Sequence, residues 1–376
     1  MSIFVVRKGD SLYQIARRYG LTAERLAYIN QLNEPSRLSI GQALVIPDDA
    51  SPTEEIEVNG YAYPNISQAT LNETLPYLTY FCPFSNRADT EGNIIPLSDK
   101  GLIGAAYARN AAPLLTVTNI GANGGFSGDI THAIFNDEAV QNRFFENLQR
   151  LLREKGYYGV NFNFEYIYPY DRLSYNNFLR RAEGILHPQG WFLSTAIAPK
   201  NSDEQQGLLY SAIDYAAHGQ YCDRVVIMTY EWGYTYSSPR AVSPVNLMRR
   251  VLDYAVTTMP AGKILLGFSN YGYNWTLPHK QGNAAAVISN AAATNLANSV
   301  FAEIKFDNTA QAPYFNYTAP DGVRHEVWFE DARSVKARLK LVSDYNLAGI
   351  SYWTVNPLFR GGLEMLNQTY GTEKIV

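Results

Sequence analysis

The chain has 376 residues, of which 46% are hydrophobic and 18% are charged, enough for one large domain and a small module. Its net charge of −4, with no long basic run, argues against nucleic acid and anionic membranes as partners. No segment has the apolar length of a signal peptide or a transmembrane helix, so we expect synthesis in the cytoplasm without an ordinary export signal.

The first 48 residues have the pattern of a small β-α-α-β unit. Ser11 is a good cap for an amphipathic helix over residues 12–19, Thr22 caps a second helix, and a closing strand covers residues 43–47. The unit closely resembles a LysM module, and the matching residues are Val6, Gly9, Asp10, Ser11, Leu12, Ile15, Ala16, Leu26, Asn30, Leu38, Gly41, Gln42, Ile46 and Pro47. The resemblance implies a module that binds glycans containing N-acetylglucosamine, in peptidoglycan or chitin. The alternative is a generic small α/β fold.

A short polar linker is predicted over residues 49–56, and strand-like and helix-like segments alternate over residues 57–376. We expect eight strands, over residues 57–63, 77–83, 114–119, 159–166, 191–198, 224–231, 264–270 and 348–354. Helices between most of them, such as the periodic segment 140–155, complete the pattern of a (β/α)8 TIM barrel. Residues from about 276 to 329 are predicted to form a small α+β insertion, a helix followed by β structure, as one wall of a cleft. We expect separate cores for module and barrel, which should act independently.

The fourth predicted strand has two opposed faces, because side chains alternate along a strand. Asn161, Asn163 and Glu165 share one face, while Phe162 and Phe164 share the other. This pattern indicates a barrel strand with polar residues toward the lumen and aromatic residues against outer helices. Glu165 then lies near the C-terminal end of the strand, where such barrels carry out their chemistry. The alternative is an edge strand with an ordinary solvated face.

Aromatic and amide side chains gather at the ends of three other predicted strands. They are Tyr230, Glu231 and Trp232 at the sixth strand, Asn270, Tyr271 and Trp275 at the seventh, and Trp353 at the eighth. Rings with an apolar face and a polar edge suit carbohydrate, although each ring could also serve ordinary packing. The sequence has no Gly-x-Ser-x-Gly elbow, phosphate loop, dinucleotide fingerprint or Cys/His cluster, so we expect neither a cofactor nor a metal.

The fourth strand resembles that of glycoside hydrolase family 18, the chitinase-like barrels. The family pattern Asp-x-x-Asp-x-Asp-x-Glu falls on Tyr158, Asn161, Asn163 and Glu165, so only the final Glu is kept. The resemblance implies that Glu165 is the general acid and that the 2-acetamido oxygen of the substrate attacks the anomeric carbon. Asn163 replaces the Asp that orients the acetamide, and an amide cannot supply the negative charge.

The same resemblance gives roles to the other strand ends. It implies that Tyr230 holds the acetamide carbonyl and that Trp353 forms the floor under the reacting sugar. Glu231 stands where chitinases often have Asp. Asn161, Trp232, Asn270, Tyr271 and Trp275 are then expected to help bind the glycan around the cleft.

Longer motifs resemble the bacterial spore-cortex enzymes of this family, which join LysM modules to the barrel and often carry two. These motifs are Asn–Phe–x–Phe–Glu–Tyr at 161–166, Met–Thr–Tyr–Glu–Trp–Gly–Tyr at 228–234, Leu–x–x–x–Asn–Tyr–Gly–Tyr–x–Trp at 266–275 and Gly–Ile–Ser–Tyr–Trp at 349–353. The resemblance implies a spore-associated N-acetylglucosaminidase that cleaves cortex peptidoglycan during germination. We expect it to be a monomer.

Two alternatives stay open. The three missing carboxylates also fit a lectin-like barrel that binds glycan without cleaving it, and a chitinase would use the same chemistry on another substrate. Turnover of cortex fragments separates the enzyme from the lectin. Comparing chitin oligomers with muropeptides separates the two enzymes.

Overall fold

The structure is a computed structural model that describes residues 2–48 and 52–376. Its centre is a closed ring of eight parallel strands: β3 (Glu55–Ala62), β4 (Tyr80–Pro83), β7 (Ala112–Thr118), β8 (Gly159–Asn163), β9 (Phe192–Ile197), β10 (Arg224–Ile227), β11 (Ile264–Ser269) and β17 (Gly349–Trp353). The ring closes because β3 pairs with β4 on one side and with β17 on the other. All eight strands overlap the predicted segments, and the predicted TIM barrel is confirmed.

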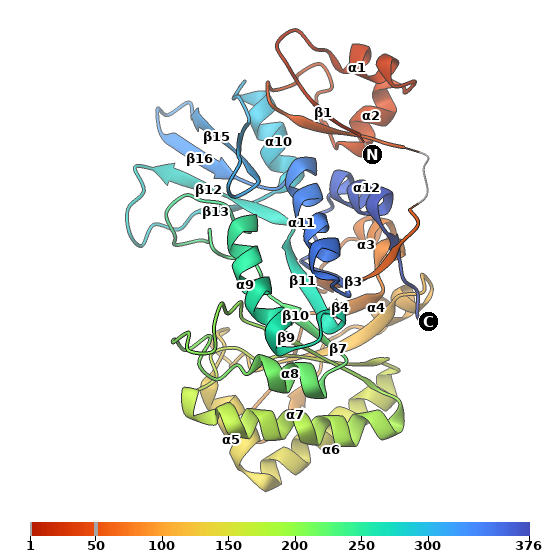
Figure 1. Cartoon of the computed structure of the whole chain (residues 1–376), viewed down its shortest axis with the longest axis vertical. Helices are drawn as coiled ribbons and strands as arrows, with labels where there is room; N and C mark the ends of the chain where they lie inside the picture. The colour runs from red at the N-terminus through yellow and green to blue at the C-terminus, as the bar shows by residue number, and fades with distance from the viewer. Residues whose placement is uncertain (1, 49–51) are drawn as a thin grey trace.

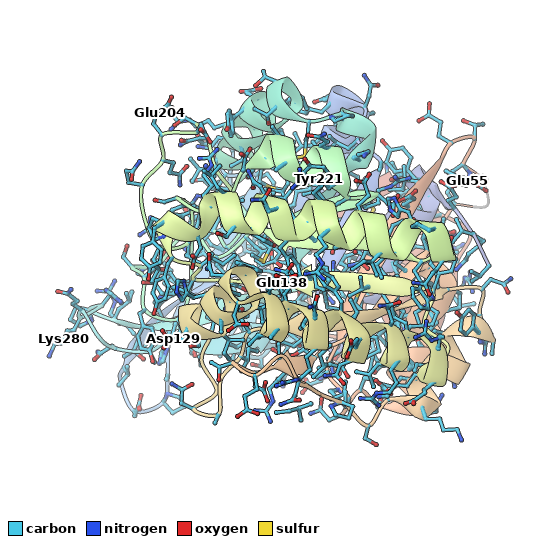
Figure 2. The ribbon with its side chains drawn as sticks, turned by 90° about the horizontal axis from the view of Figure 1, so that it is seen from below. Glu55, Asp129, Glu138, Glu204, Tyr221 and Lys280 are labelled. Carbon is cyan, nitrogen blue, oxygen red and sulfur yellow. The ribbon has the colours of Figure 1, made fainter. Side chains whose placement is uncertain are left out.

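Helices surround the ring (Figures 1 and 2). They are α3 (Gln68–Thr74), α4 (Lys100–Tyr107), α5 (Gly128–Asn136), α6 (Glu138–Lys155), α7 (Arg172–Leu186), α8 (Tyr215–Tyr221), α9 (Val245–Thr258), α11 (Ala332–Tyr345) and α12 (Arg360–Thr369). Short 3-10 turns cover Leu75–Tyr77, Pro169–Asp171, His187–Gln189 and Ala261–Lys263, and short strands are β5 (Asn86–Ala88), β6 (Ile94–Ile95) and β18 (Gly371–Thr372). No helix in these described ranges has the length and hydropathy needed to cross a membrane.

The two faces of β8 pack as their side chains predict. Phe162 and Phe164 are buried against the outer helices, where the ring of Phe178 lies 5.2 Å and 6.0 Å from theirs. Asn161 and Asn163 lie on the other face of the strand. The strand ends at Asn163, three residues earlier than predicted. Glu165 is therefore part of the turn that follows the strand.

The insertion is a five-stranded antiparallel sheet with one helix, in the spatial order β13-β12-β16-β15-β14. Its elements are β12 (Tyr271–Leu277), β13 (Ala286–Ser289), α10 (Asn290–Ser299), β14 (Lys305–Asp307), β15 (Ala312–Thr318) and β16 (Arg324–Trp328). The predicted order, a helix followed by β structure, was wrong because two strands come before the helix. The insertion also begins earlier, since Tyr271 and Tyr273 already belong to its first strand.

The N-terminal unit has the expected elements, β1 (Ser2–Val5), α1 (Leu12–Arg18), α2 (Ala23–Ile29) and β2 (Ala43–Ile46). Ser11 and Thr22 cap the two helices, as predicted, by accepting backbone N–H bonds of 3.3 Å and 3.1 Å. Residues 49–51 of the predicted linker lie outside the described residues. The last two linker positions, 55 and 56, are already the start of β3.

The unit has a core of its own, as expected, but it is also docked on the barrel, which differs from the expected independence (Figure 1). Ile29 and Val45 are 7% and 2% exposed and belong to the barrel's own hydrophobic core. The Gln31 side chain donates to the carbonyl of Leu358 at 3.0 Å and accepts the N–H of Arg360 at 2.8 Å. Polar bonds and shared apolar surface therefore hold the module in one position, a feature that the polar linker does not reveal.

Gly41 marks the closest approach between the module and the insertion. The N–H of Ile304 donates to the carbonyl of Ile40 at 2.9 Å. Gly41 has a φ of +81°, and a Cβ atom placed on it would lie 1.9 Å from the carbonyl oxygen of Ile304. Only glycine fits this backbone conformation and this contact without displacing the insertion.

We expect Gly41→Ala to undock the module and lower the melting temperature by about 4 °C or more, because a clash is added to the cost of an alanine at positive φ. Gly20→Ala is the matched control, since Gly20 also has a positive φ, +71°, but nothing within 4 Å of its Cβ position. Thermal unfolding and hydrogen exchange at the Ile304 amide measure the two effects. Equal losses in both variants, with unchanged exchange at Ile304, would contradict a tight docking.

Candidate active site

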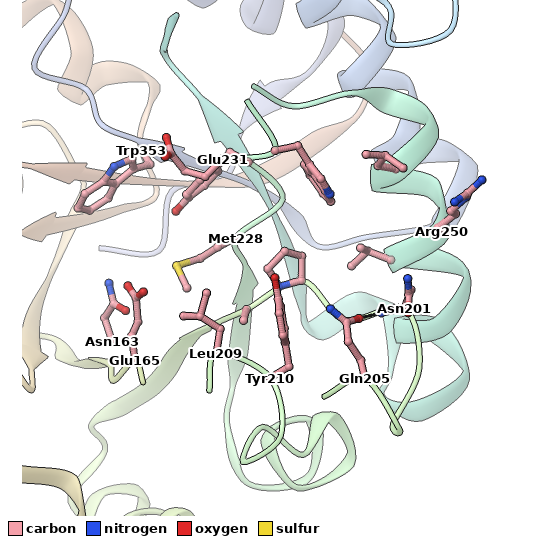
Figure 3. Close-up of a pocket in the computed structure, with 16 residues that line it drawn as sticks. Asn163, Glu165, Asn201, Gln205, Leu209, Tyr210, Met228, Glu231, Arg250 and Trp353 are labelled. Carbon is pink, nitrogen blue, oxygen red and sulfur yellow. Dashed lines mark hydrogen bonds between the residues drawn. The ribbon is translucent and has the colours of Figure 1, made fainter. Parts of the chain in front are cut away.

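A cavity of about 310 Å³ opens at the C-terminal ends of the barrel strands (Figure 3). Predicted site residues that line it are Asn163, Glu165, Tyr230, Glu231, Trp232 and Trp353. They come from the ends of β8, β10 and β17, which are far apart in the sequence and lie at alternate positions of the barrel, with β9 and β11 between them. In Figure 3, Asn163 and Glu165 point into the cavity from one side, and Trp353 and Glu231 lie across from them.

Glu165 has the protonation behaviour of a general acid. Burial raises the pKa of its carboxyl to about 7, and the nearby charge of Glu231 adds to the shift. A carboxyl with this pKa is protonated in about half of the molecules at pH 7, where an ordinary glutamate has lost its proton. It can therefore give a proton to a leaving oxygen and take one back from water.

Asn119 holds the backbone of Glu165 in place. Its side chain accepts the N–H of Glu165 at 3.0 Å and donates to the carbonyl of Glu165 at 2.8 Å. Asn119 is fully buried at the end of β7. Both backbone groups of Glu165, which lie beyond the last pair of the β8 ladder, are thus satisfied by one amide. No sequence motif indicates this role, although Asn119 is predicted as the final residue of a strand.

We expect Asn119→Ala to lower kcat by about 10- to 100-fold with a small change in KM, since a misplaced acid loses orientation rather than binding. It should also move the alkaline limb of the pH–rate profile to lower pH, because a mobile Glu165 is better hydrated. Asn86→Ala is the control: Asn86 is equally buried and also bridges two backbone groups, Thr116 and Leu97, at 3.2 Å and 2.8 Å. If the alkaline limb of the pH–rate profile moved in both variants, or in neither, the result would contradict the role of Asn119 in positioning Glu165.

Asn163 brings an unsatisfied acceptor to the cavity. Its side-chain oxygen is buried and has no hydrogen-bond partner among the described residues, and the residue is only 3% exposed. Buried polar atoms normally have partners. Asn163 therefore brings an unpaired acceptor to the wall of the cavity.

Glu231 is held by two tyrosines of the insertion. Its carboxylate accepts hydrogen bonds from the hydroxyl of Tyr271 and, at 3.0 Å, from that of Tyr273. Burial raises the pKa of Glu231, and these two donors act in the opposite direction. The residue has a φ of +65°, which is uncommon for a non-glycine residue. It brings a second carboxylate to the cavity, facing Glu165.

Tyr230 completes this group with a hydroxyl. Burial and the neighbouring carboxylates of Glu165 and Glu231 raise the pKa of Tyr230 well above its ordinary value. The phenol therefore keeps its proton over the whole physiological range. It is available as a hydrogen-bond donor to a carbonyl oxygen in the cavity.

Four residues predicted to bind substrate lie outside the cavity lining. Asn161 accepts from Tyr61 at 2.8 Å and donates to Ser194 at 2.9 Å inside the barrel. Tyr271 contacts Glu231 rather than the cavity. Asn161 and Tyr271 therefore bind neighbouring side chains and do not line the cavity in which we predicted them to contact substrate.

The other two lie at the start of the insertion. Asn270 donates to the carbonyls of Thr354 and Pro357, and Trp275 is 1% exposed and donates to the carbonyl of Ser237 at 2.7 Å. Trp275 is therefore a core residue of the insertion and not a ring on the cleft rim. Its burial depends on the insertion sheet, which the local motif does not reveal.

One whole side of the cavity is formed by residues that were not predicted from the sequence. The residues there are Ala198, Pro199, Asn201, Gln205, Leu209 and Tyr210 after β9, and Leu247, Arg250 and Val251 on α9. No motif marks them. The position of the 198–210 segment after a barrel strand was the available clue. Among residues 2–48 and 52–376, no group of three or more His, Cys, Asp or Glu side chains is arranged to hold a metal ion.

Comparison with known proteins identifies the family. The model of glycosyl hydrolases family 18 matches residues 110–357, and the LysM domain model matches residues 4–47. The chain belongs to glycosyl hydrolases family 18. Both resemblances drawn from the sequence are thereby confirmed.

Several relatives align with the chain over its whole given length. The cortical fragment-lytic enzyme of Bacillus subtilis is 41% identical over 428 aligned residues, which cover 100% of this chain and 99% of the relative. The crystal structure of the Bacillus megaterium spore cortex-lytic enzyme SleL has a TM-score of 0.94 at 32% identity and covers 100% of this chain and 99% of its own. A Chromobacterium violaceum chitinase structure has a TM-score of 0.76 at 26% identity, over 82% of this chain and 98% of its own.

Proposed function

We propose that the protein is an N-acetylglucosaminidase that hydrolyses the β-1,4 bond following N-acetylglucosamine in cortex peptidoglycan fragments. The observation that carries the proposal is the Glu165 carboxyl, with a pKa of about 7, in a cavity shared with Asn163, Tyr230 and Trp353. The full-length similarity to enzymes named for cortex lysis supports the choice of substrate.

The proposed reaction retains the anomeric configuration and uses the acetamido oxygen of the substrate as nucleophile. Glu165 protonates the oxygen of the leaving sugar and then removes a proton from the attacking water. The free oxygen of Asn163 accepts the acetamide N–H, and the Tyr230 hydroxyl donates to the acetamide carbonyl, which orients that carbonyl for attack. Trp353 covers the apolar face of the sugar.

Glu231 takes on the electrostatic part of the mechanism. The family usually has an Asp where this chain has Asn163, so the strand itself brings no second negative charge. The carboxylate of Glu231 faces the same cavity and raises the pKa of Glu165. We propose that it stabilises the positive charge that develops on the sugar.

A substrate panel tests the function. Soluble cortex muropeptides and chitotetraose are digested in parallel, and the products are identified by mass spectrometry and by NMR of the first-formed anomer. We expect cleavage after N-acetylglucosamine with a β-configured product, and faster turnover of the muropeptides. Faster turnover of chitotetraose would favour a chitinase, and an α-configured first product would exclude acetamide participation.

The LysM module supports binding to peptidoglycan or related glycans as the macromolecular partner. We further propose that the protein is a monomer and that it is associated with the spore; the names of its relatives support only the association with the spore. Light scattering of the purified protein and immunodetection in purified spores test these two proposals.

A further inference from the structure

The cavity continues well beyond the group of residues that contact the reacting bond. From Asn163 and Glu165 it runs past Leu209 and Tyr210 to Gln205 and helix α9 (Figure 3). Arg250 of that helix lies at the opposite end of the cavity from Asn163 (Figure 3). A cavity of this extent has room for groups on both sides of the bond that Glu165 protonates.

The charges along the cavity are distributed unevenly. The charged side chains that line it are Glu165 and Glu231 at one end and Arg250 at the other. Arg250 is exposed, and its guanidinium has no ion pair or hydrogen bond within residues 2–48 and 52–376. Its neighbour Arg249, by contrast, pairs with Asp344 at 2.7 Å. The guanidinium of Arg250 is thus free to turn toward an anion.

Polar and aromatic groups lie between the two ends. The backbone N–H of Asn201 donates to the side-chain oxygen of Gln205 at 2.9 Å. This bond leaves the Gln205 amide nitrogen free to donate to a ligand. Tyr210 adds ring surface along this stretch, and Trp232 also lines the cavity. Together these groups suit a second sugar whose polar arm ends near Arg250.

The chemistry of the substrate supplies the anion. Under the proposed function, the sugar on the leaving side of the bond is N-acetylmuramic acid, which carries a lactyl arm on O3. O3 is adjacent to O4, the bridging oxygen that Glu165 protonates, so the arm begins beside the cleavage point and extends away from it, where a long side chain turned inward from α9 can meet its carboxylate. The corresponding sugar in chitin has only a hydroxyl at O3. A guanidinium recognises a carboxylate through paired N–H donors.

We propose that Arg250 is a specificity determinant that binds the carboxylate carried by the O3 arm of the leaving muramyl residue. This assignment rests on the proposed function and names the chemical group by which the site distinguishes peptidoglycan from chitin. The carboxylate is either that of the lactyl group itself or that of the first residue of the stem peptide.

The test compares substrates that differ in one charge. Three tetrasaccharides of alternating N-acetylglucosamine and N-acetylmuramic acid are used, with a free lactyl acid, with its methyl ester, and with the lactyl group extended by L-alanine. We expect the wild-type enzyme to prefer an acid over the ester by roughly tenfold in kcat/KM, as for one charge-assisted hydrogen bond. Arg250→Ala should bring this ratio close to one, mainly through KM, and Arg250→Glu should invert it.

The remaining variants and substrates separate the possible outcomes. Arg250→Lys should keep part of the preference because it retains the charge without the planar fork. Arg249→Gln, on the same helix, should keep the full wild-type ratio. A higher ratio for the free lactyl acid assigns the contact to the lactyl group, and a higher ratio for the L-alanine substrate assigns it to the stem peptide. Both results support the proposal.

Two results would overturn it. An unchanged acid-to-ester ratio in Arg250→Ala, with normal cleavage of the muropeptides, refutes the role of Arg250 and leaves the proposed function standing. An enzyme that cleaves none of the three tetrasaccharides refutes the proposed function and this specificity with it.

Discussion

Glu165→Gln should lower kcat on cortex fragments by about 10³-fold or more, because the amide keeps the shape of the acid but cannot give up a proton to the leaving oxygen. Affinity for an uncleaved glycan should stay within about twofold, since Trp353, Tyr230 and Asn163 remain in place. Steady-state kinetics and calorimetric titration measure the two quantities. Wild-type kcat in this variant would remove Glu165 from the mechanism.

The same change should stabilise the fold at alkaline pH. The pKa of Glu165 is raised in the folded state to about 7, so the folded protein binds this proton more tightly than the unfolded chain does. Stability is therefore lost as the pH rises from about 4.5 to about 7 and stays lost above that range. Glu165→Gln removes the buried charge, and its melting temperature should exceed that of the wild type most clearly above pH 7.

Glu330 provides the control for this experiment. Burial also raises the pKa of Glu330 to about 7, but its carboxylate is paired with the buried guanidinium of Arg338. Glu330→Gln breaks an ion pair and leaves a charge uncompensated, so it should lower the melting temperature. It should not abolish turnover, because Glu330 does not line the active cavity.

Glu231→Gln should lower kcat by about 10²- to 10³-fold, the usual cost of losing one preorganised electrostatic group. The alkaline limb of the pH–rate profile should also move to lower pH, because the charge that raises the pKa of Glu165 is gone. Full pH–rate profiles of kcat/KM measure both effects.

Tyr273→Phe separates the charge of Glu231 from its placement. This variant keeps the carboxylate but removes the 3.0 Å hydrogen bond from the Tyr273 hydroxyl. We expect a smaller loss of kcat and an alkaline limb that stays near its wild-type position. A limb that is identical in the wild type and in Glu231→Gln would show that burial alone sets the pKa of Glu165, and would leave Glu231 without an electrostatic role.

Local patterns were sufficient to predict the barrel. Strict alternation along β8 placed Phe162 and Phe164 against the outer helices, and the apolar spacing of residues 140–155 predicted α6, which spans Glu138–Lys155. These features depend on neighbours in the sequence and on the periods of strand and helix. The same periods brought Glu165 to the catalytic end of the barrel.

Contacts between distant segments set the limits of sequence analysis. Asn119 is hydrogen-bonded to Glu165, which lies 46 residues later in the sequence. Arg250 lines the cavity from α9, the helix that follows β10. The predicted sugar contact of Trp275 was wrong because a distant segment covers its ring. An aromatic motif at a strand end looks the same in the sequence whether the ring is exposed to sugar or buried under a sheet. These contacts form only when the fold is assembled, and no repeating pattern in the nearby sequence predicts them.

Docking of the LysM module fixes the distance and orientation between this module and the catalytic cleft. A module on a flexible tether would let the catalytic domain sweep a volume around each anchoring point and sample glycan strands in many orientations. Here, the bonds of Gln31 and the close contact at Gly41 join the two parts into one body. When the module is bound to a glycan strand, the cleft therefore lies at one fixed distance and orientation from that strand. The spacing and direction of neighbouring strands then determine which bonds the cleft can reach.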